Sequence, residues 1–390
     1  MLVELLAIVF LCVLAALRTP VFGSGDEGYH LSYAVDLAEG RGLPVVGQTL
    51  VQPEVLALQD GVYPAAATAR AEDLGFRGLS YEGFQPPLFY ALAAPVSALS
   101  DDWRTKVTMV RLLSVALLAV GLVVLTVLCR LVRPEDPLPL LAVAAAPLLF
   151  PAVREQEILV GNDVLLIPLT LGFACCAWTA SRRRSPAALW AAGLLAGLML
   201  LTKLTSVWAV PVLVLVGIAV LRAQDTARGR TLTVLGTAAP GLMLLPWIAL
   251  NLDRYGSLTA NDLVLRLQAE VSPPTDPSVL TQAQEVLRVL VQVVLGRRDE
   301  YPGWVTLAAG AVGLLLLISS TVIALGRLGP RPVAVVLALP LVLQVALLCA
   351  LSVLQGTQLL YERYLHPVVP LTVIAAFVVV RSRRASSPAG

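Results

Sequence analysis

The chain has 390 residues, of which 57% are hydrophobic and 14% are charged, and its formal net charge is +2. A soluble domain carries roughly 25% charged residues, so this composition excludes an ordinary soluble enzyme and indicates a polytopic membrane protein. The net charge gives no sign of nucleic-acid binding. All five cysteines lie inside apolar runs without a CxxC spacing, so we interpret them as buried apolar side chains rather than zinc ligands or disulfides.

About ten apolar runs are candidates for membrane-spanning helices. They cover about 2–20, 107–129, 138–153, 163–180, 187–202, 204–221, 231–250, 303–325, 333–354 and 365–380. A span needs roughly 17–25 residues, so 138–153 and 187–202 are marginal and are expected to be tilted or partly re-entrant. The first run predicts an uncleaved signal anchor, because no basic residue precedes it and no small-residue cleavage site follows it.

The short loops differ in charge on the two sides of the predicted bundle. One side holds Arg130, Arg133, Arg182, Arg183, Arg184, Arg222, Arg228, Arg230, Arg327, Arg331, Arg381, Arg383 and Arg384. The other side holds only Arg154, Lys203 and Arg363 in its short loops. Because cytoplasmic loops are rich in Lys and Arg, the sequence predicts that both termini are cytoplasmic. The long segments 21–106 and 251–302 are then extracytoplasmic.

The predicted fold is therefore an all-α polytopic membrane protein with interfacial helices in its first long outer segment. We expect a single transmembrane domain over residues 1–384 and a disordered cytoplasmic tail over 385–390. Within the first outer segment, 27–39 reads as an amphipathic helix ended by Gly40, and Pro87–Leu99 as a short apolar helix. The second outer segment contains an apolar helical stretch near 283–295.

The stretch GSGDEGYHLSYAVD places an acidic pair, Asp26 and Glu27, directly after the first apolar run. Asp26 and His30 are four residues apart and share one face of the predicted helix. Such a pair is suited to orienting a general base or holding a cation. The alternative is structural: Asp26 caps the helix and Glu27 complements its dipole.

Lys203 is one of only two lysines and lies in LMLLTKLTSVW, at the outer end of a tight helical hairpin. One interpretation is a snorkelling side chain that marks the membrane edge. The other is a point charge that contacts a lipid-linked phosphate, a role that suits an ammonium group. The two prolines in YEGFQPPLFYALAAP fit the first turn of an apolar helix, which is structurally ordinary.

The order of these pieces resembles the GT-C superfamily of polyprenyl-phosphate-sugar-dependent membrane glycosyltransferases. The likeness is closest to the branch of protein mannosyltransferases and aminoarabinose transferases. It rests on DEGYHLSYAVDLAEGRGLP, FQPPLFYALAAP, VGNDVLLIPLTLG, GLMLLTKLTSVWAVP, LPWIALNLDRYGSL and YERYLHPVVPL, which together span nearly the whole chain. Gln85 stands where many relatives have His, and the number of predicted spans is smaller than in characterised members.

The resemblance implies inverting transfer of a sugar from a polyprenyl-phosphate donor to a glycan, lipid or protein acceptor outside the plasma membrane. It implies Asp26 as the catalytic base, with Glu27 as the second acidic candidate. Lys203, Arg154 and Arg363 would bind the donor phosphate. The expected cleft or acceptor residues are His30, Gln85, Tyr90, Glu157, Asp163 and His366. Some relatives use a divalent cation, so Mg or Mn is a candidate cofactor, with Asp26, Glu27 and His30 as its ligands.

Two other classes of function remain open at the level of sequence. A transporter or flippase of lipid-linked sugars would need charges along a path through the membrane. Here the charges gather at one end of the helices, which disfavours transport. A non-catalytic envelope assembly protein would tolerate replacement of Asp26.

Overall fold

The computed structural model describes residues 2–22, 26–58, 78–149, 158–269, 278–295, 303–325, 331–355 and 361–386. Within these ranges every regular element is a helix, and the one extended pairing is an isolated bridge between Leu50 and Leu79. The predicted all-α fold is therefore confirmed.

Six helical segments within the described ranges are long and apolar enough to cross a membrane. They are α5 (Trp103–Val132), α8 (Asp163–Arg183), η4 with α10 (Leu204–Leu221), α11 (Ala227–Tyr255), α14 (Gly303–Ala324) and η5 with α15 (Val333–Gln355). Shorter apolar helices accompany them, namely α1 (Leu2–Arg18), α4 (Leu88–Ser97), α9 (Pro186–Thr202) and α16 (Val369–Ser386). The structure thus shows a multi-pass membrane protein, and the count of about ten spans is not confirmed.

The marginal span predicted at 138–153 is described as far as residue 149. This part is α6 (Leu138–Ala145), of eight residues, followed by the four-residue 3₁₀ helix η3 (Ala146–Leu149). Residues 150–153 lie outside the described residues, so the full length of this span stays a prediction. Pro147 lies in η3 and has no N–H to donate to the preceding turn, which is a physical reason for the change of helix type.

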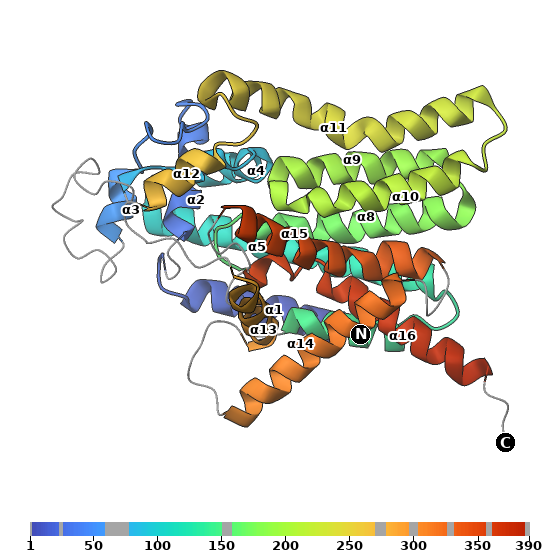
Figure 1. The fold of residues 1–390 in the computed structure, drawn as a ribbon. Helices are drawn as coiled ribbons and strands as arrows, with labels where there is room; N and C mark the ends of the chain where they lie inside the picture. Colours follow the sequence, from blue (N-terminus) through green and yellow to red (C-terminus); the bar gives the residue numbers. More distant parts are fainter. Residues whose placement is uncertain are drawn as a thin grey trace.

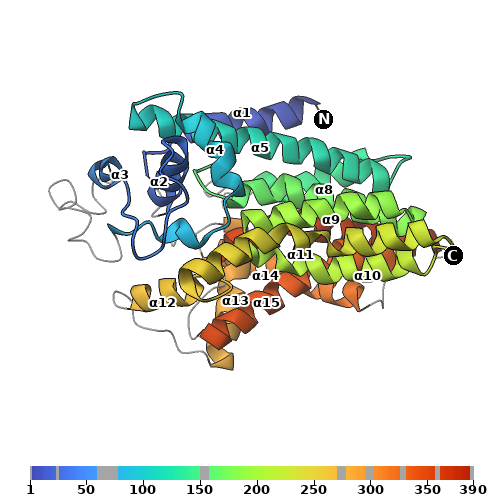
Figure 2. The same cartoon turned by 90° about the horizontal axis from the view of Figure 1, so that it is seen from above.

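Helices α8, α9, α10 and α11 run side by side through the bundle (Figures 1 and 2). Glycines allow α9 and α11 to approach closely. A Cβ at Gly193 would clash with the carbonyl oxygen of Gly236, and one at Gly197 would clash with Met243. Small residues at such crossings let helix backbones pack in direct contact. This packing fixes the position of Lys203, which directly follows α9.

One end of the bundle is covered by short helices (Figure 1). They are α2 (Glu27–Ala38), α3 (Pro53–Leu58), the 3₁₀ helix η2 (Tyr81–Phe84), α4 and α12 (Asn261–Ala269). The predicted helix after Pro87 is confirmed as α4. The helical stretch predicted near 283–295 is confirmed as α13 (Val279–Leu295).

Helix α2 ends near Gly40 as predicted, and Gly40 has a positive φ of 73°. It is not the half-exposed amphipathic helix that the sequence predicted, however. Ten consecutive residues, Glu27 to Asp36, are buried, because α3, η2 and α4 all pack against the helix.

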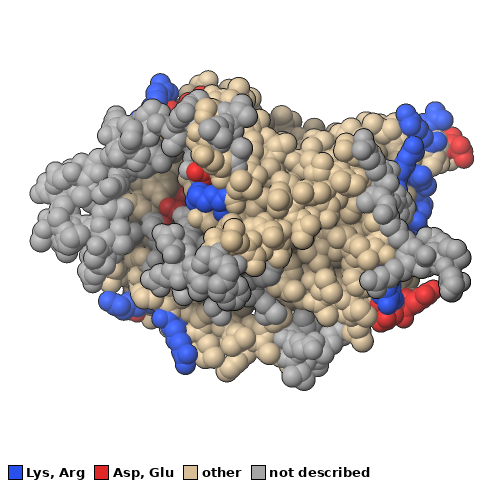
Figure 3. All heavy atoms as spheres, turned by 60° about the horizontal axis from the view of Figure 1, so that its bottom comes forward, with Lys and Arg blue, Asp and Glu red and all other residues tan. Residues whose placement is uncertain are grey.

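The far end of the bundle is strongly basic. Helix α8 runs from Asp163 at the end with the short helices to Arg183 at the far end, and α9 runs back to the end with the short helices, where Lys203 follows it. Helix α10 then runs to the far end, and α11 runs back again. Six arginines therefore gather at the end remote from α2: Arg182, Arg183, Arg184, Arg222, Arg228 and Arg230. Figure 3 shows basic residues grouped at this end. Of the predicted disordered tail, residues 385 and 386 are helical, and 387–390 lie outside the described residues.

Candidate active site

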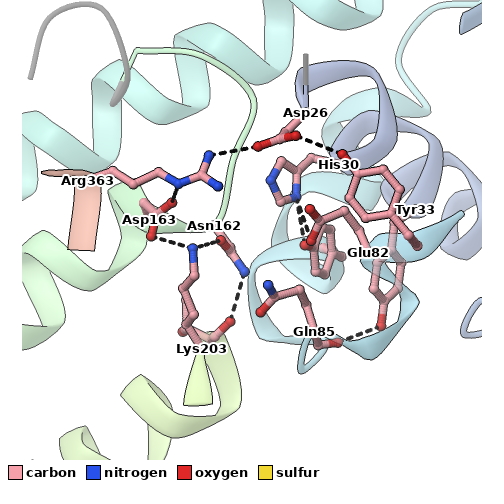
Figure 4. Close-up of polar contacts among 12 residues, drawn as sticks. Asp26, His30, Tyr33, Glu82, Gln85, Asn162, Asp163, Lys203 and Arg363 are labelled. Atoms are coloured by element: carbon pink, nitrogen blue, oxygen red, sulfur yellow. Dashed lines mark hydrogen bonds and ion pairs between the residues drawn. The ribbon is translucent and has the colours of Figure 1, made fainter. Parts of the chain in front are cut away.

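A polar pocket lies at the end of the bundle that the short helices cover. It is lined by Asp26, His30, Leu159, Val160, Gly161, Asp163, Val164 and Arg363. These residues come from the start of α2, the turn before α8, the start of α8 and the 3₁₀ helix η6 (Glu362–Tyr364). Acidic and basic atoms are visible together in a hollow of the surface in Figure 3, and Figure 4 shows the side chains around the pocket.

Asp26 lies immediately before α2 and binds groups from two distant segments. Arg363 Nη1 donates to its Oδ2 over 2.9 Å, and the Tyr81 hydroxyl donates to its Oδ1 over 2.7 Å. The side chain makes no capping hydrogen bond with the first turn of α2, so the capping alternative is wrong. Burial alone would raise the pKa of Asp26, but the Arg363 charge and the Tyr81 hydroxyl hold that pKa well below its usual range.

Lys203 lies across the pocket and is buried, with 3% of the residue exposed. Its Nζ donates to Asp163 Oδ1 over 2.7 Å and to Asn162 Oδ1 over 3.3 Å. The same Nζ lies 4.3 Å from the centroid of the Tyr364 ring. A snorkelling lysine would extend its charge into water. The snorkelling interpretation is therefore wrong, because this ammonium group points into the protein toward the start of α8 (Figure 4).

Arg363 joins the two halves of the site. It bonds to Asp26 on one side, and its Nε lies 3.6 Å from Asp163 Oδ2 on the other. The resulting chain of charges runs from Asp26 through Arg363 and Asp163 to Lys203, with the signs alternating. Nε is buried and has no hydrogen-bond acceptor in the described part of the chain. The guanidinium thus keeps donor capacity at the pocket wall.

His30 also lines the pocket, and Glu82 lies behind it. His30 Nδ1 is 2.8 Å from the Tyr90 hydroxyl and 3.8 Å from Glu82 Oε2. Burial lowers the pKa of His30 to about 3 and raises the pKa of Glu82 to about 8. Burial thus favours the neutral form of both side chains, and the ion pairs of the site join Asp26 and Asp163 with Lys203 and Arg363.

Glu27 is placed differently from its neighbour. It is fully buried, and both of its carboxylate oxygens accept hydrogen bonds of 2.7 Å from Arg111. Its Oε1 also accepts the Val160 N–H over 3.1 Å. Adjacent helical residues point about 100° apart, so Asp26 faces the pocket while Glu27 faces α5. The prediction of Glu27 as a catalytic or metal-binding residue does not agree with this position.

The remaining predicted residues lie behind the pocket or outside the described ranges. Tyr90 supports His30, and its ring stacks on Tyr33 with the centroids 3.8 Å apart. The Gln85 backbone carbonyl accepts a 3.4 Å bond from the Tyr33 hydroxyl. His366 is buried three residues after Arg363 and does not line the pocket. Arg154 and Glu157 lie outside the described residues.

The structure reveals site residues that sequence reasoning missed. Glu82 and Tyr81 occupy the same YEGF turn, and one side chain approaches His30 while the other binds Asp26. The available signal was an acidic residue four positions before the first proline of a Pro-Pro helix start. Arg111 is a single cation inside the long apolar run of α5. Intramembrane charges are costly unless paired, which was the signal that could have found it.

The donor groups at the pocket do not fit a divalent cation. Among the described residues, no three His, Cys, Asp or Glu side chains are grouped as metal ligands. Asp26 is paired with Arg363, and Glu27 is paired with Arg111. Mg or Mn would have to displace a guanidinium from each carboxylate. We derive no catalytic step through a metal.

Residues 84–350 match the family model described as "Glycosyltransferase family 87". The chain belongs to glycosyltransferase family 87. No curated protein sequence matches it. Two solved structures of ArnT from Cupriavidus metallidurans are similar, both at 15% sequence identity. The apo structure has a TM-score of 0.55 and aligns over 98% of this chain and 61% of that one. The structure bound to undecaprenyl phosphate has a TM-score of 0.53 and aligns over 97% of this chain and 60% of that one.

This family 87 chain therefore spans about 60% of the length of the ArnT chains it resembles. At this level of identity the likeness shows a shared fold. Together with the family match, it confirms the prediction of a GT-C-type membrane glycosyltransferase. The reaction of this chain must be inferred from the side chains that line and surround its own pocket.

Proposed function

We propose that this chain is an inverting glycosyltransferase that moves a sugar from a polyprenyl-phosphate donor to an acceptor hydroxyl outside the membrane. The observation that carries the proposal is the charged cluster at the pocket, in which Arg363 pairs with Asp26 and Asp163, and Lys203 pairs with Asp163. A base for the acceptor and positive charge for a leaving phosphate are the groups that this reaction needs.

The two cations define the place of the donor phosphate. Lys203 supplies a compact charge at the end of α9, and Arg363 supplies a planar guanidinium with an unused Nε donor. Both groups lie at one end of a bundle whose fold is shared with an ArnT structure bound to undecaprenyl phosphate. Arg154 stays a predicted third cation, because it lies outside the described residues.

In the proposed step, Asp26 accepts the proton of the acceptor hydroxyl. The hydroxyl oxygen attacks the anomeric carbon on the face opposite the phosphate. The bond between that carbon and the phosphate oxygen breaks, and its electron pair passes to the phosphate. Lys203 and Arg363 stabilise the negative charge that develops there. The anomeric configuration is inverted, and polyprenyl phosphate leaves.

The ion pair between Asp26 and Arg363 implies an order for these events. While Arg363 holds Asp26, the low pKa of the carboxylate makes it a weak base. A bound phosphate competes for the guanidinium and adds a negative charge near Asp26. Both effects raise the pKa of Asp26. Asp26 therefore becomes an effective base when the donor is bound.

The sidedness of the pocket follows from the charge distribution. The pocket and the arginine-rich end lie at opposite ends of the bundle, and basic ends face the cytoplasm. Helix α1 ends beside the Arg111 contact with the Thr19 carbonyl, and α16 begins six residues after Arg363, so both helices extend away from the pocket end. Figure 2 shows α1 extending away from α2. We propose that the pocket faces outside and that both termini are cytoplasmic.

The proposal is tested by comparing two lipids on the purified protein. Undecaprenyl phosphate should bind and raise the Tm, whereas undecaprenol, which lacks only the phosphate, should bind at least tenfold more weakly. A donor in which a labelled sugar is joined to the same lipid phosphate should then release undecaprenyl phosphate when an acceptor is added. Equal affinity for the two lipids, or no release from any such donor, would contradict the proposal.

A further inference from the structure

The largest fully buried side chain in the described structure is Arg111, in the N-terminal third of the long apolar helix α5. All five of its N–H donors are used. Nε and Nη2 bind the two oxygens of Glu27. The remaining donors bind the carbonyl oxygens of Ala16, Thr19 and Pro20 over 3.1, 2.6 and 2.6 Å. A guanidinium has five donors in a fixed plane, so this one has no capacity left to bind a ligand.

The segments that Arg111 holds are those that build the pocket. Glu27 is joined through the backbone to Asp26, and its Oε1 accepts the N–H of Val160, which lines the pocket. One helical turn further along α5, Ser114 donates to the carbonyl of Leu159 over 2.9 Å. Two α5 side chains thus set the position of the turn 158–161 and of the start of α2.

We infer that Glu27 and Arg111 are positioning residues that hold the catalytic carboxylate Asp26 against the opposite wall of the pocket. The inference rests on the proposed function, because it assigns Asp26 as the base. The pair acts through Asp26 and the turn 158–161 and contacts neither donor nor acceptor. A displacement of about 1 Å at a reacting group costs on the order of 10²-fold in rate.

The test separates positioning from folding with a paired substitution. Glu27→Gln or Arg111→Met alone leaves a buried group without its partner, which destabilises a protein strongly. The double variant Glu27→Gln and Arg111→Met removes both charges at similar volume and so leaves no unpaired buried charge, at the cost of the bonds from Arg111 to three backbone carbonyls. We expect it to fold, to bind undecaprenyl phosphate within about threefold of the wild-type Kd, and to transfer sugar roughly 10²-fold more slowly.

Hydrogen exchange gives a second readout that does not depend on activity. The amides of 158–161 and of the first turn of α2 should exchange faster in the double variant, while those of α8 and α9 stay protected. Asp36→Asn is the matched control, because it breaks the other ion pair of α2, with Arg41, away from the pocket. It should leave kcat and the exchange of 158–161 unchanged.

Two outcomes would overturn the inference. One is a wild-type kcat in the double variant, and the other is unchanged exchange of 158–161. If the double variant fails to fold, Ser114→Ala provides the test, because it removes the second bond to the same turn. Faster exchange of 158–161 with a wild-type kcat in Ser114→Ala would then reject the inference, because the inference requires the position of this turn to govern transfer. If the wild-type protein itself transfers no sugar, the proposed function fails, and the exchange data alone decide the positioning role.

Discussion

Lys203 shows how strongly a single side chain in this site depends on its neighbours. Its ammonium group is buried among Asp163, Asn162 and the Tyr364 ring. In the resting site it neutralises Asp163, and in the proposed reaction it faces the leaving phosphate. Both roles need a positive charge at the end of α9.

Lys203→Ala should therefore weaken the binding of undecaprenyl phosphate, and the transfer of sugar, by about tenfold to a hundredfold. The reason is the loss of a charge-assisted hydrogen bond of roughly 1.5–3 kcal/mol. Lys203→Arg should rescue part of the loss. The control is Lys106→Ala, which removes the other lysine, one that lies over the Trp103 ring. Equal effects of the two alanine variants on donor affinity would exclude Lys203 from the donor site.

The protonation of Glu82 makes the stability of the folded protein depend on pH. Its pKa is about 8 in the folded protein, raised mainly by burial from an ordinary value of 4.5. The folded state therefore keeps a proton that the unfolded chain loses above pH 4.5. Such a group stabilises the fold fully below pH 4.5, and its contribution is lost as the pH rises toward 8. The groups whose charges act on it are Asp26, Asp163, Lys203 and Arg363.

Glu82→Gln should consequently flatten the pH dependence of stability on the alkaline side. The wild-type Tm should fall between pH 6.5 and 8.5, and the Tm of the variant should fall less, because glutamine stays neutral throughout. Thermal unfolding in one detergent across this range measures the effect. Parallel curves for the two proteins would mean that Glu82 is already ionised at neutral pH. His30, whose pKa is about 3, changes stability only on the acid side.

At the scale of elements, the sequence predicted a helix well where a glycine or proline marked one of its ends. Gly40 ended α2, Pro87 preceded α4, and the apolar stretch near 283–295 became α13. The run at 138–153 has apolar residues throughout but also prolines, and its described part is short. Whether this run crosses the membrane stays a prediction, because residues 150–153 lie outside the described residues.

The packing of α9 against α11 makes an element-scale prediction. Gly193→Ala adds a methyl group that would clash with the Gly236 carbonyl. Overpacking of this kind costs about 1–3 kcal/mol, and the displaced α9 carries Lys203. We expect a lower Tm and weaker binding of undecaprenyl phosphate.

Gly241→Ala in α11 is the matched control for this change. A Cβ at Gly241 would have no atom within 4 Å, and alanine favours a helix over glycine by up to about 1 kcal/mol. The control should keep or raise the Tm. If Gly193→Ala behaves in the same way, the two helices do not pack as described.

The candidate site was partly predictable for a physical reason. Polar residues at helix ends are conspicuous beside apolar runs in the sequence. Four such residues line the pocket, namely Asp26, His30, Asp163 and Arg363, and Lys203 bonds to Asp163. The roles of Asp26 and Glu27 could not be assigned in the same way. Which of two adjacent carboxylates faces α5 depends on Arg111, 84 residues away from Glu27 along the chain.

At the scale of the whole molecule, the two ends of the bundle differ in charge, and this predicts its orientation. Gln48 is exposed at the pocket end, and Ala223 is exposed at the arginine-rich end. In a background without cysteines, Gln48→Cys should react with an impermeant thiol reagent added to intact cells, and Ala223→Cys should react only after lysis. The reverse pattern would place the pocket in the cytoplasm and contradict the proposed acceptor side.

The central claim is that Asp26 is the base of a sugar transfer in this pocket. Asp26→Asn tests it most directly, because asparagine keeps the size of the side chain and its amide oxygen can still accept from one of the two donors, Tyr81 or Arg363. Binding of undecaprenyl phosphate and turnover of the lipid-linked donor should be measured on one purified preparation. We predict a folded variant that still binds the lipid and transfers sugar about 10²–10⁴-fold more slowly. Near-normal turnover in that preparation would contradict the assignment.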